Sequence, residues 1–204
     1  MATVHEMRTR GMHDYDSILD VVPWADFTRY PGEPLEERLA YFRRSQEPFS
    51  FGVYKSHVAP PLVHLRPKVR YIVGFRSYLD VAASLKPFLY SHRDDFIYLW
   101  GLFSSKILPE DSFYRAIVIG QKLSLAKGLI ESMVLDYVEG WWPHRHDPNV
   151  LFLHYADRLR EPLEDIKVID RFLGTNLTDA DVETVYSRSN FQYMKRYSKK
   201  FEYC

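Results

Sequence analysis

Apolar and polar positions along the chain alternate between short β-prone runs and amphipathic helical segments. The run at residues 71–75 is almost continuously apolar, which is typical of a strand covered on both faces. The run ends at Arg76, and Ser77 then offers an N-cap hydroxyl with Asp80 completing a capping box, so we expect a helix to begin there. This junction places Arg76 at the carboxyl end of a parallel strand, where open α/β sheets bind anionic ligands.

The other apolar runs predict the rest of an α/β fold. Residues 49–54 and 150–155 are expected to form two further strands. We therefore expect a parallel sheet with helices on both faces. Apolar residues at helical spacing, together with capping signals, predict helices over residues 3–9, 35–46, 166–173 and 178–186, and a long helical region over residues 111–142.

Length and composition indicate one globular domain over residues 1–204. The chain is 46% hydrophobic and 16% aromatic, enough to form a sizeable core. Its 27 Lys and Arg residues balance 27 Asp and Glu residues, so no net charge favours nucleic acid or an acidic membrane as a partner. The one cysteine, Cys204, allows no internal disulfide, and no apolar run approaches the length of a membrane span. We expect a cytoplasmic protein.

Two further segments carry candidate chemistry. Residues 88–110 mix aromatic and charged side chains without a clear period; they could line an apolar acceptor pocket, but an ordinary surface insertion is favoured. His144 and His146 lie beside Asp147 in a loop, and with no third ligand type in view we expect no metal site there.

Lys55 and His57 follow the β-prone run at residues 49–54 and precede a pair of prolines. This places both side chains at the expected carboxyl edge of a strand. A neutral imidazole suits a general base, because its ordinary pKa lies near working pH. A histidine in a loop more often forms a local hydrogen bond, and from these residues alone that simpler interpretation is favoured.

Four groups of residues, taken in chain order, resemble motifs of the cytosolic-type sulfotransferases. The ordered set is far more specific than any single match. The matching positions are Lys55-Ser56-His57 for the family's Lys-Thr-His, Arg76 to Ser84 for its Arg-Asn-Pro-x-Asp-x-x-x-Ser, Tyr155-Ala156-Asp157 for its Tyr-Glu-Asp, and Ser189-Asn190-Phe191 for its Thr-Ser-Phe.

The resemblance implies a P-loop-NTPase-like sulfotransferase architecture and a metal-free reaction. The donor would be PAPS (3′-phosphoadenosine 5′-phosphosulfate), and the sulfuryl group would pass to a hydroxyl or amine of a small-molecule acceptor. His57 would be the general base, and Lys55 would help position or neutralise the sulfuryl group. The donor would be held by Arg76 and Ser84 at its 3′-phosphate and by Tyr155, Ser189 and Phe191 at its adenosine.

The sequence departs from the family at both ends. It has no Pro-Lys-x-Gly-Thr-Thr-Trp phosphosulfate loop and no Arg-Lys-Gly segment, so we expect an N-terminally truncated form of the architecture. Loss of that anion cradle would cost several orders of magnitude in rate. A catalytically inactive sulfotransferase-like protein or fragment, acting as a binding module, is therefore the main alternative, ahead of a nucleotide kinase of the same architecture. The sheet edge left open would be covered in a homo-oligomer.

Overall fold

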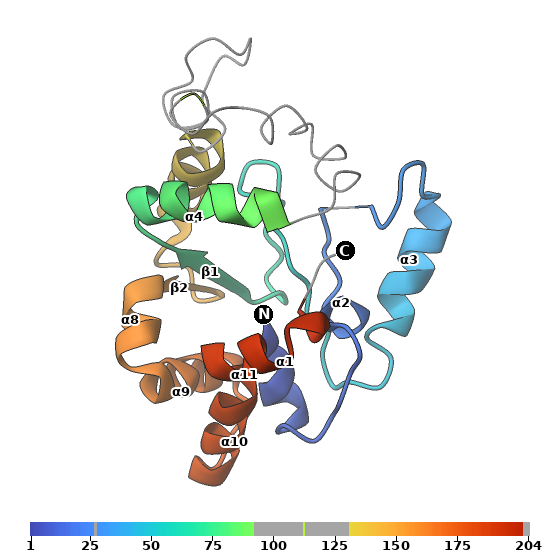
Figure 1. Ribbon diagram of the computed structural model, residues 1–204, viewed down its shortest axis with the longest axis vertical. Coiled ribbons are helices and arrows are strands. Elements are labelled where there is room, and N and C mark those ends of the chain that lie inside the picture. The colour runs from blue at the N-terminus through green and yellow to red at the C-terminus, as the bar shows by residue number, and fades with distance from the viewer. Residues whose placement is uncertain (27, 92–111, 113–130, 202–204) are drawn as a thin grey trace. The chain divides into compact units, whose positions relative to one another are not determined.

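The computed structural model describes residues 1–26, 28–91, 112 and 131–201 (Figure 1). The chain divides into two compact units. Unit 1 comprises Met1–Ser56 and Asp157–Tyr203, and unit 2 comprises His57–Ala156. The single domain expected over residues 1–204 stays a prediction, and most of the segment at residues 88–110 lies outside the described residues.

Unit 2 contains the predicted strand-to-helix junction. Strand β1 (Tyr71–Phe75) pairs in parallel with β2 (Val150–His154), and the register runs from Tyr71 opposite Val150 to Phe75 opposite His154. The prediction for residues 71–75 is confirmed, and the one for residues 150–155 is confirmed as far as His154, after which Tyr155 begins a helix. The β-branched and aromatic residues of both runs favour a pleated, packed surface.

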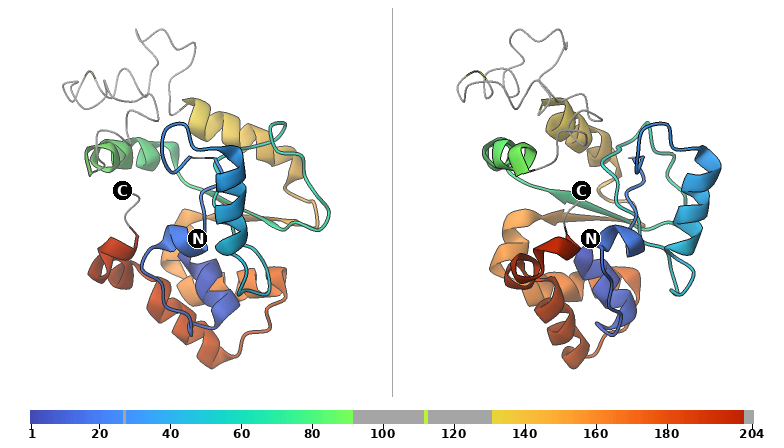
Figure 2. Two further views of the ribbon diagram at one scale, coloured as in Figure 1. Left: turned by 90° about the vertical axis from the view of Figure 1, so that its right-hand side faces the viewer. Right: turned by 45° about the vertical axis from the view of Figure 1, so that its right-hand side comes forward.

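Helices follow or precede each strand of unit 2. In Figures 1 and 2, α4 and the helix that ends at Trp141 lie on the same side of the two strands. Helices on a second face of a larger sheet stay a prediction. The helical elements are α4 (Tyr78–Ser91), with Pro87 inside it, the π-helical turn η2 (Glu131–Asp136), α7 (Tyr137–Trp141) and the 3₁₀ turn η3 (Trp142–His144).

Trp141 anchors the core of unit 2. It is buried and packs with Val73 of β1 and Val150 of β2. Gly140, the residue before it, faces the segment that follows His57: a Cβ atom at Gly140 would lie 2.4 Å from the carbonyl oxygen of Pro60. Only a glycine allows the backbone of α7 to approach this segment so closely.

Unit 1 is largely helical. Helix α1 (Ala2–Thr9) packs against α9 (Pro162–Leu173) and α10 (Asp179–Ser189), as Figure 1 shows. Local signals set the helix ends as predicted: Gly174, at φ 69°, ends α9, and Thr178 with Asp181 forms a capping box at the start of α10. The remaining helical elements are α2 (Ile18–Val21), α3 (Leu35–Arg44), α11 (Phe191–Arg196) and the 3₁₀ turn η4 (Ser198–Lys200), together with α8 (Tyr155–Arg160), whose first two residues belong to unit 2.

The prediction of a strand over residues 49–54 is wrong. The chain there makes only one isolated parallel bridge, between Trp24 and Lys55. Side chains satisfy backbone groups that a strand would pair: the Val53 amide donates to Gln46 Oε1 at 2.8 Å, and Arg8 donates to the Phe51 carbonyl at 2.9 Å. Once these groups are used, β-propensity alone does not form a ladder.

Candidate functional site

Arg76 lies directly after β1, where its side chain meets Tyr155, which directly follows β2 (Val150–His154). The Arg76 guanidinium carbon is 4.6 Å from the centre of the Tyr155 ring. Two of the predicted site residues are therefore brought together, because Phe75 and His154 are register partners and the next residue of each strand emerges at the same sheet edge.

The Arg76 side chain has an unused hydrogen-bond donor. Its Nε is buried and makes no hydrogen bond within the described residues. The nearest carboxylate, Asp80 Oδ2, is 3.5 Å from Nε and belongs to a side chain that is 57% exposed, so this ion pair contributes little. A buried donor on a permanently charged group fits an oxyanion ligand, because charge-assisted hydrogen bonds are the strongest that a guanidinium makes.

Ser84 is exposed on α4, two turns after Ser77. Its hydroxyl donates to the Val81 carbonyl at 3.0 Å, a bond within its own helix. Over the described part of the chain, no hydrogen bond links Ser84 to Arg76. The structure therefore places Ser84 on the predicted helix face without joining it to Arg76.

Lys55 of unit 1 is held against an aromatic ring. Its Nζ lies 3.5 Å from the centre of the Trp24 ring, a cation–π geometry. Burial lowers the pKa of Lys55 to about 8, and the charge of Asp26 partly opposes this shift. Asp26 in turn accepts hydrogen bonds from Trp24 Nε1 at 3.3 Å and Ser56 Oγ at 2.7 Å.

No local sequence signal links Trp24 and Asp26 to Lys55. Trp24 follows Pro23 at the end of an amphipathic segment, and this position predicts an element boundary only. The contact forms because the backbone of Lys55 pairs with Pro23 and Ala25: the Lys55 amide donates to the Pro23 carbonyl at 3.0 Å, and the Ala25 amide donates to the Lys55 carbonyl at 2.7 Å.

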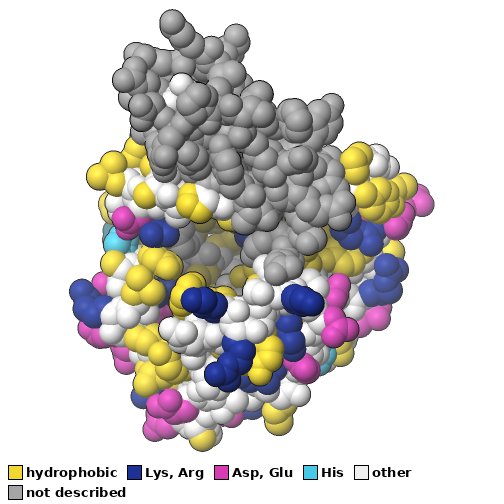
Figure 3. Space-filling view, in the orientation of Figure 1, with side chains coloured by type: hydrophobic (Ala, Val, Ile, Leu, Met, Phe, Trp, Pro, Cys, Tyr) yellow, Lys and Arg dark blue, Asp and Glu magenta, His cyan; other side chains and the backbone are white. Residues whose placement is uncertain are grey.

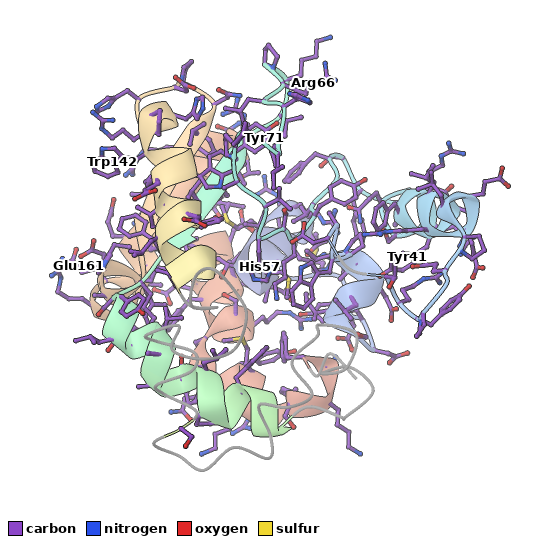
Figure 4. All side chains as sticks on the ribbon, turned by 90° about the horizontal axis from the view of Figure 1, so that it is seen from above. Tyr41, His57, Arg66, Tyr71, Trp142 and Glu161 are labelled. Atoms are coloured by element: carbon purple, nitrogen blue, oxygen red, sulfur yellow. The ribbon has the colours of Figure 1, made fainter. Side chains whose placement is uncertain are left out.

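His57 belongs to unit 2, on a segment without regular secondary structure that leads toward β1 (Figure 4). Its side chain is exposed. Further along the same segment, the Arg66 amide donates to the Tyr71 hydroxyl at 3.0 Å, and Figure 4 shows these two residues near each other. An exposed imidazole on an anchored segment can exchange a proton with a bound molecule.

Ser189 and Phe191 of unit 1 flank the boundary between α10 and α11. The Ser189 hydroxyl donates to the Val185 carbonyl at 2.7 Å, and Asn190 caps α11 by accepting from the Tyr193 amide at 2.8 Å. Phe191 is 66% exposed. An exposed ring beside a capped helix end offers a flat face on which a nucleobase can stack.

A polar pocket of about 530 Å³ lies beside this boundary. Lys195 and Arg196 contribute its positive charge, and neither forms an ion pair within the described residues. Figure 3 shows Lys and Arg side chains gathered on the face where Figure 1 places α11. In sequence these two residues only indicate a helix C-terminus. The pocket is lined by Ser187, Asn190, Gln192, Tyr193, Lys195 and Arg196.

His144 and Asp147 form a local pair: His144 Nδ1 is 2.8 Å from Asp147 Oδ2. Across the ranges that the structure describes, no group of three His, Cys, Asp or Glu side chains is arranged to hold a metal ion. The same ranges contain no helix with the length and apolar character needed to cross a membrane.

Comparison with known proteins gives a family match. The sulfotransferase domain family matches residues 5–202 of this chain. The rabbit (Oryctolagus cuniculus) amine sulfotransferase is 24% identical over 136 residues, which are 64% of this chain and 45% of the relative. The mouse sulfotransferase 6B1 is 29% identical over 140 residues, 65% of this chain and 39% of the relative. The chain spans less than half the length of these relatives.

Solved structures show the same fold. Mouse sulfotransferase SULT7A1, complexed with PAP, has a TM-score of 0.53 at 19% identity and covers 75% of this chain and 51% of its own. Retinol dehydratase, in complex with androsterone and the inactive cofactor PAP, has a TM-score of 0.52 at 22% identity and covers 88% of this chain and 50% of its own. The described residues show part of this fold, a two-stranded parallel sheet among helices.

Proposed function

This chain belongs to the cytosolic-type sulfotransferase family, and from that premise we propose that it transfers a sulfuryl group from PAPS to a hydroxyl or amine of a small-molecule acceptor. Arg76 carries the proposal. It lies at the carboxyl end of a parallel strand, rests on Tyr155 and keeps a buried Nε donor without a hydrogen bond in the described part of the chain. A phosphate oxygen is the ligand that this donor fits best.

The other predicted residues have environments that support nucleotide binding. Phe191 and Tyr155 expose aromatic faces, 66% and 40% of each residue being accessible. Ser84 and Ser189 each direct the hydroxyl donor to a helix carbonyl, which leaves the oxygen lone pairs available as acceptors. We assign the 3′-phosphate to Arg76 and Ser84 and the adenosine to the remaining three.

We assign the chemical steps of the transfer to Lys55 and His57. In the transfer, the acceptor oxygen or nitrogen forms a bond to sulfur, the bond between sulfur and the bridging oxygen of PAPS breaks, and PAP leaves with that electron pair. His57 would take the acceptor's proton. Lys55, with its pKa lowered to about 8 by burial, is mostly protonated at neutral pH and would offset negative charge on the sulfuryl group.

The test is calorimetric binding of PAP to the purified chain and to Arg76→Ala. Hydrogen bonds to charged groups contribute about 1.5–3 kcal/mol, so we expect the variant to bind about tenfold to a hundredfold more weakly. Arg145→Ala is the matched control, because the Arg145 guanidinium also stacks on an aromatic ring, at 4.7 Å from the Trp142 ring centre, in the same unit. It should bind PAP as the wild type does.

The outcomes separate transfer from simple binding. A folded wild-type chain that does not bind PAP at millimolar concentration would refute the proposal. Binding that depends on Arg76, but with no sulfuryl transfer from PAPS to any of a panel of phenols, alcohols and amines, would support the alternative of a non-catalytic binding protein. Turnover that is lost in His57→Ala would support the assigned general base.

A further inference from the structure

A buried carboxylate on α1 forms an ion pair with the end of α10 that carries Ser189. The Glu6 side chain is fully buried, and Arg188 Nε donates to Glu6 Oε2 at 2.8 Å. Arg188 is the residue directly before Ser189. The pair therefore links α1 to α10 at one end of the α10 helix.

Arg188 is held from a second side as well. Its Nη2 donates to the His13 carbonyl at 3.2 Å and lies 3.6 Å from Asp14 Oδ1. Asp14 also forms an ion pair with Lys200 of η4. The guanidinium is thus held between α1 and the segment that follows α1.

Arg188 also contacts α11, which contains Phe191. Its guanidinium carbon is 5.8 Å from the centre of the Tyr193 ring. The Tyr193 amide donates to the Asn190 side chain, which is the N-cap of α11. One side chain therefore touches both helices whose boundary carries the residues assigned to the nucleoside.

The Glu6–Arg188 pair is costly for a purely structural contact. Burial raises the pKa of Glu6, and the hydrogen bond from Arg188 only partly opposes this shift. The second carboxylate oxygen, Oε1, makes no hydrogen bond of normal geometry within the described residues, and the nearby Tyr15 hydroxyl only partly opposes the rise in the pKa of Glu6. A buried ion pair of this kind gains little stability over apolar packing, but it fixes one orientation.

We propose that Glu6, acting through Arg188, is a positioning residue that holds Ser189 and Phe191 in the orientation needed for nucleotide binding. The inference rests on the proposed function for the identity of the nucleotide. The positioning effect is a difference in the local structural stability of residues 189–196, which can be measured without any ligand.

The chain provides a matched control at the other end of α10. Arg10, just after α1, forms an ion pair with Asp181 in the first turn of α10. This pair also links α1 to α10, but far along the helix from Ser189. Arg10→Met removes this link while Asp181 keeps its bond from the Thr178 amide at 2.8 Å, just as Glu6→Met leaves Arg188 its bond to the His13 carbonyl.

The experiment measures amide hydrogen exchange over residues 189–196 without nucleotide, and PAP affinity by calorimetry. We expect Glu6→Met to speed exchange in this segment and to weaken PAP binding about tenfold. Arg10→Met should leave both unchanged while lowering the melting temperature. Equal effects of the two variants on both readouts, or unchanged exchange in Glu6→Met, would overturn the proposal.

Two further variants keep the test decisive. If Glu6→Met does not fold, Arg188→Lys keeps the charge but shortens the reach of the donor, and unchanged exchange over residues 189–196 in that variant would also overturn the proposal. The double variant Glu6→Met/Arg188→Met should bind PAP no more weakly than Arg188→Met alone; additive losses would contradict action through Arg188. If the wild type does not bind PAP but Glu6→Met speeds exchange, the proposed function fails and the positioning role stands.

Discussion

Replacement of Gly140 by alanine should destabilise unit 2 and displace the segment that follows His57. The added Cβ atom would lie 2.4 Å from the Pro60 carbonyl oxygen and 3.0 Å from the Ala59 Cβ atom. Contacts below 3.0 Å do not occur between such atoms, so either α7 or the segment at residues 59–60 must move. The atom that is struck belongs to the backbone, which cannot avoid the clash by changing a rotamer.

The expected magnitude follows from two opposing effects. Alanine is favoured over glycine in a helix by about 1 kcal/mol. Overpacking costs about 1–3 kcal/mol, and we take the upper part of this range, about 2–3 kcal/mol, because the atom that is struck is backbone and the shift also disturbs Trp141, the buried neighbour of Gly140. We expect a net loss of about 1–2 kcal/mol in the free energy of unfolding, measured by urea denaturation followed by tryptophan fluorescence.

Gly74→Ala is the matched control, because a Cβ atom at Gly74 in β1 would meet nothing within 4 Å. It should change the free energy of unfolding by less than about 1 kcal/mol, in either direction. A Gly140→Ala variant as stable as the wild type, or an equal loss of unfolding free energy in both glycine variants, would refute the predicted clash. Where the proposed sulfuryl transfer is detected in the wild type, its loss in Gly140→Ala alone would connect the close approach to the placement of His57.

Three further predictions concern titration, capping and the stacked arginine. Because the pKa of Lys55 is lowered to about 8, the unfolded chain binds more protons than the folded chain between pH 8 and about pH 10.4. The wild type should therefore gain stability relative to Lys55→Met as pH rises through this window. A difference in urea midpoint between the wild type and Lys55→Met that is the same at pH 7.5 and at pH 10 would contradict this. Thr178→Ala removes the capping box with Asp181 and should cost about 1 kcal/mol in thermal unfolding, whereas Thr178→Ser should retain most of it. Tyr155→Leu removes the ring under Arg76 and should weaken PAP binding severalfold in calorimetry, with Tyr155→Phe as the control that keeps the ring; equal affinities of the two variants would exclude a role for stacking.

The sequence by itself determined the elements whose signals are local. The apolar run at residues 71–75 is a strand, the run at 150–155 is a strand up to His154, Gly174 ends a helix, and Thr178 begins one. Each of these outcomes depends on residues within a few positions of one another, so periodicity and capping chemistry are sufficient. The ordered motifs also indicated the sulfotransferase family, which the match over residues 5–202 confirms.

Only the tertiary structure decided which distant residues meet. Three contacts join segments that are far apart in the chain. Arg76 stacks on Tyr155, Lys55 lies over the Trp24 ring, and Glu6 is buried in an ion pair with Arg188. Tertiary contacts also explain why residues 49–54 do not form the predicted strand, because side chains from other elements make the hydrogen bonds that a strand would need. Local β-propensity contributes about 1 kcal/mol per residue or less, and several hydrogen bonds formed across the fold, each contributing about 0.5–1.5 kcal/mol, together outweigh it.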